Sequence, residues 1–270
     1  MQTIQYLYTK ENKIFGELKY TATVFSDYSK HFHTHFGLAL IEEGVLEITY
    51  GRENPVTLNN HSIALFNPRQ IHRSQSINAQ GYYVLFLDNQ WCNTIQKDFF
   101  FHNTILNDPK YYRELKEIFH KILQMDVTSI GNELKLCITE IFLTYADRNV
   151  IKEKSLITQI KNVITTKYDE SLSVEDIAKY LGYDKSYLIR RFKKEVGITP
   201  QQYILNEKVN RAKDLLIYST LTNLSDISAH AGFFDQSHFN RNFKGLFGTT
   251  PKKYKKVNIV QDNTNDIRYD

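Results

Sequence analysis

The sequence predicts a multi-domain protein, with an all-β domain at the N-terminus, a helical segment after it and an all-α domain at the C-terminus. Three observations predict this fold class. Short segments of alternating hydrophobicity occupy residues 25–87, apolar stripes at helical spacing occupy residues 108–149, and one pattern occurs twice between residues 173 and 256. With 270 residues, the chain is long enough for two hydrophobic cores.

The duplicated pattern reads Phe-Lys-Lys-Glu-Val-Gly-Ile-Thr-Pro at 192–200 and Phe-Lys-Gly-Leu-Phe-Gly-Thr-Thr-Pro at 243–251, an offset of 51 residues. A constant offset indicates one supersecondary unit that is used twice. In each copy the Thr-Pro pair can begin a further helix, because the first helical residue does not need the N–H that proline lacks. The first of these helices is predicted over residues 200–218, where it would join the two units rigidly.

Each unit is predicted to be a helix, a tight turn and a second helix. In the first unit, Ser173 is the expected N-cap of a helix that ends at Gly182, and the second helix covers residues 185–196. In the second unit, Ser225 is the expected N-cap and the second helix covers residues 236–247. The second helix of the first unit leaves four basic side chains for solvent or a partner: Arg190, Arg191, Lys193 and Lys194.

The stretch Gly-Phe-Phe-Asp-Gln-Ser-His-Phe-Asn-Arg-Asn-Phe-Lys at 232–244, with Gly-Thr-Thr-Pro following, resembles the most diagnostic part of the DNA-binding domain of AraC/XylS-family transcription regulators. The resemblance covers residues 155–256. It implies a double helix-turn-helix that binds promoter DNA, with the second helix of each unit in the major groove. Two departures from the family pattern, Ser228 for Ala and Lys208 for Arg, change details and leave the DNA-binding face in place.

Carried over by position, the family pattern implies base contacts from both second helices. The expected residues are Ser186, Ile189 and Arg190 in the first unit and Gln236, Ser237, His238, Asn240 and Arg241 in the second. The arginines can pair with guanine, and Gln236 or Asn240 with adenine. The alternative is that some of these side chains contact only phosphates. Residues 155–256 carry 17 Lys and Arg against 10 Asp and Glu, a formal +7 that suits a phosphate backbone.

The N-terminal part contains short candidate strands separated by turn residues, which favours a barrel or a sandwich. They cover residues 31–41, 45–50, 55–58, 62–66, 71–75 and 82–87. Three features resemble the cupin-like sensor domain of this family: His31-x-His33-x-His35, then Glu42-Glu43-Gly44, then Phe66-Asn67-Pro68 leading to His72. The resemblance covers residues 20–90 and implies a barrel that binds a small-molecule effector. Strand alternation would place the first three histidines on one side.

The expected effector-binding residues are His33, His35, Tyr50, His72 and Tyr82. Metal-dependent cupins use His-x-His, a Glu and a later His, so His33, His35, Glu42 and His72 form an alternative ligand set. The sensors of this family usually bind no metal, and the glycine that metal-dependent cupins carry before the distal His is absent. We therefore expect no metal and no other cofactor, with a plain structural role as the third alternative for the histidines.

The segment 108–149 carries two apolar stripes, which consist of Leu115, Ile118, Phe119 and Ile122, and of Leu134, Ile138, Ile141, Phe142 and Tyr145. In relatives such helices pair two protomers; alternatively they cover the barrel of their own chain. A charged linker is expected at 147–154. The expected domains are a sensor at 1–95, a helical dimerisation and linker region at 96–152, the DNA-binding domain at 155–256 and a polar tail at 257–270.

Other features narrow the class of protein. No run of 18 apolar residues is present and the first 13 residues are polar, so a cytoplasmic location is expected. Cys92 and Cys137 lack metal-like spacing, and Cys92 lacks the motif of a repair methyltransferase. The sequence thus favours a homodimeric, non-enzymatic transcription regulator, an activator by family habit, with promoter DNA, RNA polymerase and an effector as partners. The alternatives are a metal-dependent cupin enzyme fused to a DNA-binding domain, and an effector-free regulator controlled by a partner protein.

Overall fold

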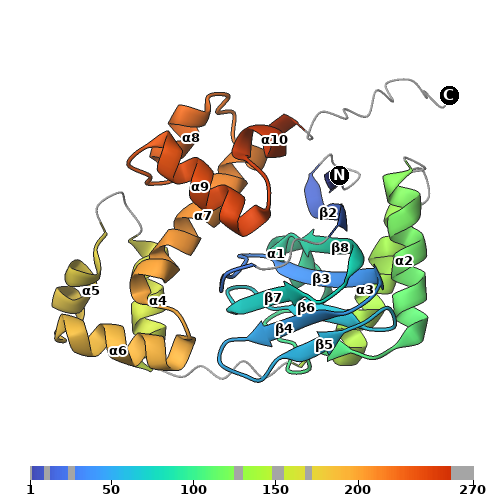
Figure 1. Cartoon of the computed structure of the whole chain (residues 1–270), viewed down its shortest axis with the longest axis horizontal. Helices are drawn as coiled ribbons and strands as arrows, with labels where there is room; N and C mark the ends of the chain where they lie inside the picture. Colours follow the sequence, from blue (N-terminus) through green and yellow to red (C-terminus); the bar gives the residue numbers. More distant parts are fainter. Residues whose placement is uncertain are drawn as a thin grey trace.

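The computed structural model describes residues 2–8, 13–23, 28–124, 130–147, 155–167 and 172–256. Residues 148–154 of the expected linker, and the expected tail at 257–270, lie outside the described residues. An N-terminal β-rich domain and a C-terminal helical domain lie side by side (Figure 1), so the predicted fold class is confirmed.

Two antiparallel sheets build the N-terminal domain, in the orders β1-β2-β8-β3-β6-β9 and β5-β4-β7. The strands are β1 (Gln2–Tyr8), β2 (Ile14–Thr23), β3 (Phe36–Glu43), β4 (Leu46–Tyr50), β5 (Val56–Leu58), β6 (Ile63–Phe66), β7 (His72–Ser76), β8 (Gln80–Leu87) and β9 (Ile105–Leu106). Between the sheets lies an apolar core that includes Ile41, Ile48, Phe66 and Phe86. The interior of the barrel is therefore largely filled by side chains.

Two strand predictions were wrong. β1 and β2 were missed, because β2 carries Glu17 and Lys19 at buried positions, and charged residues break the apolar alternation that marks a strand. The strand predicted over residues 31–41 begins only at Phe36; upstream of it, His31 makes an isolated bridge to His72. The segment 31–35 is therefore irregular, and strict strand alternation does not govern its side chains.

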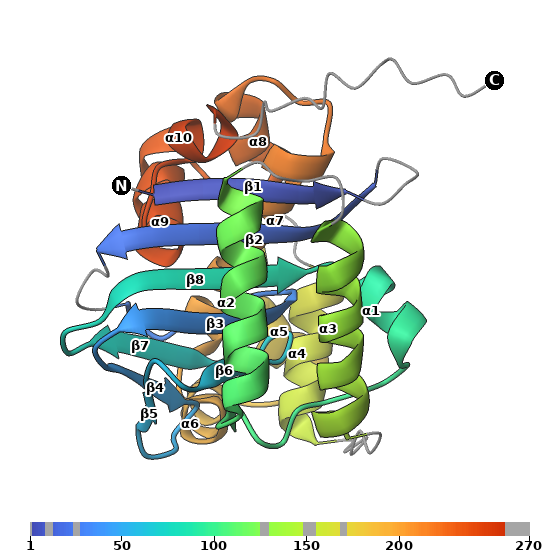
Figure 2. The ribbon, with the colours of Figure 1, turned by 90° about the vertical axis from the view of Figure 1, so that its right-hand side faces the viewer.

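Three helices complete this domain: α1 (Asn89–Ile95), α2 (Pro109–Leu123) and α3 (Ile130–Tyr145). Figure 2 shows α2 and α3 in front of the larger sheet. Their predicted stripes pack on it, since Leu115, Phe119, Leu134 and Ile138 share one core cluster with Leu85 of β8. The reading in which these helices cover the barrel of their own chain is thus confirmed.

The C-terminal domain has seven helices among the described residues: α4 (Leu156–Thr166), α5 (Val174–Leu181), α6 (Lys185–Val196), α7 (Pro200–Tyr218), α8 (Leu224–His230), α9 (Gln236–Phe247) and α10 (Pro251–Lys256). The two helix-turn-helix units are α5–α6 and α8–α9, and α7 joins them (Figure 1). Ser173 caps α5 in a capping box with Asp176, and Gly182 ends it in the left-handed conformation at φ 74°. The Ser173 cap and the end at Gly182 were predicted, whereas the part played by Asp176 was not.

The predicted cap of the second unit was wrong. Asn223, not Ser225, is the N-cap of α8, and its side chain accepts a hydrogen bond from the Ser225 N–H. Asn and Ser are about equally good N-caps, so residue type alone could not choose between two candidates that lie two positions apart.

Candidate nucleic-acid interface and sensor domain

The second helices of the two helix-turn-helix units, α6 and α9, are built alike. Asp184 and Asp235 cap their N-termini, each accepting a hydrogen bond from a backbone N–H three residues later. Gly197 and Gly248 end them with positive φ. One apolar stripe of each helix is buried: Leu188, Phe192 and Val196 in α6, and Phe239, Phe243, Leu246 and Phe247 in α9. The opposite face of each helix is left for solvent or a partner.

The predicted base-contacting residues lie on α6 and α9. Five of them are exposed: Ser186, Arg190, Gln236, Ser237 and Arg241. Ile189, His238 and Asn240 are half-buried: Ile189 packs against the core of the first unit, and the His238 ring packs edge-on against Phe233 at 5.5 Å. Residue by residue, base contact stays a prediction.

One exposed aromatic residue near this face was missed by the sequence analysis. Phe234 directly precedes the cap Asp235 and is 98% exposed, whereas Phe233 beside it is buried. The Phe-Phe pair was the available signal, since two adjacent side chains in a tight turn seldom share one core.

Some of the basic residues next to this face are engaged within the chain. Arg191 forms an ion pair with Glu195 one turn later, and Lys185 Nζ lies 2.7 Å from the Glu175 carboxylate of α5. Arg52, from the turn between β4 and β5, donates a hydrogen bond to the Lys194 carbonyl oxygen. The C-terminal end of α6 thus touches the sensor domain.

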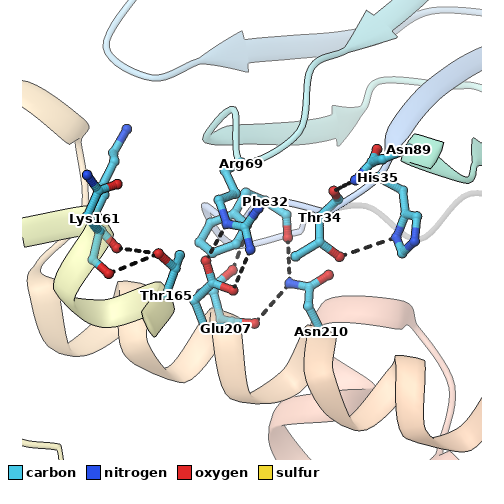
Figure 3. A network of polar contacts seen from close by, with 11 residues as sticks. Phe32, Thr34, His35, Arg69, Asn89, Lys161, Thr165, Glu207 and Asn210 are labelled. Atoms are coloured by element: carbon cyan, nitrogen blue, oxygen red, sulfur yellow. Dashed lines mark hydrogen bonds and ion pairs between the residues drawn. The ribbon is translucent and has the colours of Figure 1, made fainter. Parts of the chain in front are cut away.

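The domains are joined mainly through α7. Asn206 accepts a hydrogen bond from the Phe32 N–H at 3.2 Å, and Asn210 donates one to the Phe32 carbonyl oxygen at 3.0 Å. Arg69 lies 2.6 Å from Glu207 in an ion pair (Figure 3). The Phe32 ring is fully buried, 4.6 Å from that of Tyr203, inside the core of the first unit.

A second set of contacts is buried and ionic. Lys213 of α7 lies 2.7 Å from Glu17 of β2, and both side chains are almost completely buried. Tyr254 of α10 donates a hydrogen bond to the same carboxylate, and Lys19 donates one to the Phe247 carbonyl oxygen at 2.7 Å. Burial lowers the pKa of Lys19 to about 8. These contacts explain why β2 tolerates two charged residues.

The histidines do not form the metal set that the sequence suggested. His31, His33 and His72 lie together, a group named here the three-histidine cluster. His35 lies apart, with its Nδ1 3.2 Å from the Thr34 hydroxyl, because the segment before β3 is irregular. Glu42 instead accepts a hydrogen bond from Tyr83 at 2.6 Å and lies 3.0 Å from His120 of α2. The set His33, His35, Glu42 and His72 is therefore wrong.

Burial governs the protonation of these rings. It lowers the pKa of His31 to about 4 and that of His35 to about 3, and it holds those of His33 and His72 well below the usual range. Lys19 and Lys213 lower the pKa of His33 further. All four rings are neutral at pH 7.

Two cavities lie between the domains. The larger, of about 960 Å³, lies between the barrel and helices α4 and α6, and its walls include Tyr50, Arg69, Lys161 and Tyr203. The smaller, of about 280 Å³, is lined by Thr34, His35, Arg69, Asn89, Thr165, Glu207, Arg211 and Asp214. Figure 3 shows Arg69 and His35 facing α7 from the sensor domain.

The predicted effector residues are divided among several places. Tyr50 lines the larger cavity and His35 the smaller, whereas His33 and His72 belong to the three-histidine cluster. The Tyr50 hydroxyl donates to the Leu65 carbonyl oxygen at 3.0 Å. Tyr82 is half-buried against the barrel core, and burial raises its pKa. The five residues do not line one cavity.

The fold and the site define a class of protein in which a β-barrel domain packs against two helix-turn-helix units. Residues 23–136 match the model of an AraC-like ligand binding domain, and residues 177–256 match that of a helix-turn-helix domain. The chain thus combines an AraC-like ligand binding domain with a helix-turn-helix domain. Among the described residues, no helix has the length and apolar character needed to cross a membrane.

Curated relatives are named as regulators. The Msm operon regulatory protein of Streptococcus mutans is 34% identical over 141 residues, which cover 51% of this chain and 50% of that protein. The HTH-type transcriptional regulator YbfI of Bacillus subtilis is 25% identical over 235 residues, covering 80% and 82%. The chain spans half or less of the length of two of these relatives, 50% for the Msm protein and 29% for a Staphylococcus aureus regulator.

Solved structures share the two-domain fold. The crystal structure of ToxT from Vibrio cholerae O395 aligns with a TM-score of 0.59 at 12% identity, covering 91% of this chain and 98% of ToxT. ToxT with a bound unsaturated fatty acid aligns with a TM-score of 0.58 at 14% identity, covering 90% and 94%. At such identity the likeness establishes the arrangement of the fold.

Proposed function

We propose that this protein regulates transcription by binding promoter DNA through α6 and α9, without catalytic activity of its own. The observation that carries the proposal is the pair of recognition helices, each buried on one side and polar on the other, held by one helix. α7 has 19 residues and so spans about 28 Å, close to one turn of DNA. Each protomer would thus contact two adjacent major-groove segments.

Regulation is proposed to come from a small molecule bound between the domains. The walls of the larger cavity carry charges of both signs, Arg52, Arg69 and Lys161 against Glu53 and Glu195, and Arg69 is paired with Glu207; such a lining favours a polar ligand. One ToxT structure holds an unsaturated fatty acid; a fatty acid, an amino acid, a sugar and a phenol are all candidates here. A ligand that touches both walls would favour one arrangement of the domains through its differential affinity for the two arrangements.

The proposed assembly is a homodimer that acts in the cytoplasm, where promoter DNA and RNA polymerase are found. The sequence suggested five effector-binding residues, His33, His35, Tyr50, His72 and Tyr82, which lie in several places and not around one cavity. Of these, Tyr50 and His35 have the most direct support, because each lines a cavity between the domains.

Footprinting on DNA upstream of the gene and its neighbours tests the proposal. Salt is held constant, because phosphate contacts make affinity depend on it. We expect two protected major-groove segments one turn apart, and loss of protection in an Arg190→Ala/Arg241→Ala variant. Full protection by this variant would contradict the proposal. So would an absence of protection by the wild type in the presence of every candidate class of effector.

A further inference from the structure

The three-histidine cluster lies where the sensor barrel meets the helical domain. His31 and His33 come from the irregular segment before β3, and His72 begins β7. One nitrogen of each ring lies within 4.8 Å of the other two. His31 and His72 are almost fully buried, and Phe66 and Phe86 form an apolar wall, each with its ring centroid 4.5 Å from a cluster ring.

Hydrogen bonds to backbone carbonyls fix two of these rings. His31 Nδ1 lies 2.7 Å from the Ser29 oxygen, and His72 Nδ1 lies 3.0 Å from the Gln70 oxygen. A ring nitrogen must carry hydrogen to donate to a carbonyl, so in each of these neutral rings the lone pair is on Nε2. Metal-binding histidines are oriented in this way, by a hydrogen bond from the nitrogen that does not bind the metal.

The spacing of the nitrogens also suits a metal. His31 Nε2 and His33 Nε2 are 3.2 Å apart. Two imidazole nitrogens on one tetrahedral zinc ion lie about 3.3 Å apart, from bonds of about 2.05 Å. Without a metal, this distance is that of a hydrogen bond from the His33 Nε2–H to the His31 Nε2 lone pair, which a bound ion would replace.

We propose that His31, His33 and His72 bind one transition-metal ion of the class that prefers imidazole, such as Zn²⁺, Co²⁺ or Ni²⁺, with a further position left for water or effector. This set differs from the one that the cupin resemblance suggested, which contained His35 and Glu42. Lys19 and Lys213 lie close enough to act on His33, while Glu17 neutralises Lys213. The two lysines weaken the site for a cation, so we expect reversible binding.

The same segment connects the cluster to the DNA-binding domain. Between His31 and His33, Phe32 points the other way, into the core of the first helix-turn-helix unit. Its N–H and carbonyl oxygen are held by Asn206 and Asn210 of α7. A metal that draws the two histidines toward His72 therefore also moves the anchor of α7. This coupling rests on the proposed function, whereas the metal site itself does not.

The test uses the full chain without an affinity tag, stripped of metal by dialysis against a chelator. Co²⁺ is the probe, followed by its visible d–d absorption, and bound metal is counted by elemental analysis. We expect one Co²⁺ per chain, displaced by Zn²⁺. His31→Ala and His72→Ala should weaken binding at least about 10-fold. The matched controls, His35→Ala in the same segment and His102→Ala on the surface, should bind like the wild type.

No Co²⁺ absorption in the wild type would overturn the metal site, and this result needs no variant to fold. Equal binding by His72→Ala, or loss of binding in His35→Ala, would overturn the assignment to these three residues. The coupling is tested by titrating the footprinted DNA with and without metal; an unchanged affinity would overturn it. If the metal-free protein binds DNA, the proposed function holds even when the metal site or its coupling to DNA binding is disproved.

Discussion

At the scale of single residues, the proposed DNA-binding surface depends on side chains that the fold leaves exposed. Arg241 and Phe234 stand exposed on α9 and just before its cap. Neither belongs to a buried core, so replacing them should leave folding intact and change only what the surface binds.

For Arg241→Ala we expect a loss of about 1–3 kcal/mol in binding free energy at one base step, because a bidentate contact to guanine would be removed. Fluorescence anisotropy with a set of single-base variants of the footprinted site measures this. Arg113→Ala, on an exposed part of α2, is the matched control. If base preference is unchanged in Arg241→Ala, this arginine contacts only phosphate.

The histidines show which features of the site were predictable from the sequence and which were not. Their presence near the sensor core was predictable, but their grouping was not. Pairing His33 with His35 assumed regular strand geometry, whereas β3 starts only at Phe36. His31 joins the cluster because its backbone bridges His72, a contact between segments 41 residues apart that no local pattern records.

At the scale of elements, the helices of the second half were predicted to the residue where caps and periodicity agree. α6, α7 and α9 each have a side-chain N-cap, and α6 and α9 also end at glycine. β1 and β2 were missed because the partners of Glu17 and Lys19 lie more than 190 residues away. Local patterns predict an element well only when its stabilising contacts are also local.

α3 carries the element-scale prediction for assembly. Leu136 and Leu143 are seven residues apart and 67% and 60% exposed, on the side of the helix away from the barrel. We expect the wild type to sediment as a dimer and Leu136→Lys/Leu143→Lys as a monomer. In the expected dimer both leucines would be buried. Replacing them removes about 3 kcal/mol or more of association free energy, which raises the dimer Kd about 100-fold.

The control for that experiment is Ile77→Lys, which adds the same charge at an exposed apolar position outside α3. It should sediment like the wild type. A wild type that stays monomeric at micromolar concentration, both free and on DNA, would refute the role of α3 in assembly.

At the scale of the whole molecule, a titratable carboxyl is buried at the interface between the domains. Asp214 of α7 lines the smaller cavity, and burial raises its pKa from 3.8 to about 6. The folded protein therefore holds this proton more tightly than the unfolded chain does. Stability is lost as pH rises from about 4 to 6, and the loss is complete above about pH 6.

Asp214→Asn removes the free-energy cost of ionising this buried carboxyl. We expect its thermal unfolding midpoint to exceed that of the wild type at pH 7, by an amount equivalent to at most about 3 kcal/mol, and the advantage to vanish below about pH 4. The matched control is Glu117→Gln, which replaces an exposed carboxyl on α2. A constant difference across the pH range would contradict the assignment to Asp214.

The position of Phe32 has a consequence for any attempt to isolate the helical half. Its ring fills part of the core of the first helix-turn-helix unit, although it comes from the other end of the chain. A fragment of residues 155–256 would keep every recognised motif and still contain a hole lined by Tyr203 and its neighbours. The match to a helix-turn-helix domain covers residues 177–256, which can suggest an independent folding unit. Its packing nevertheless depends on Phe32, a residue outside that segment.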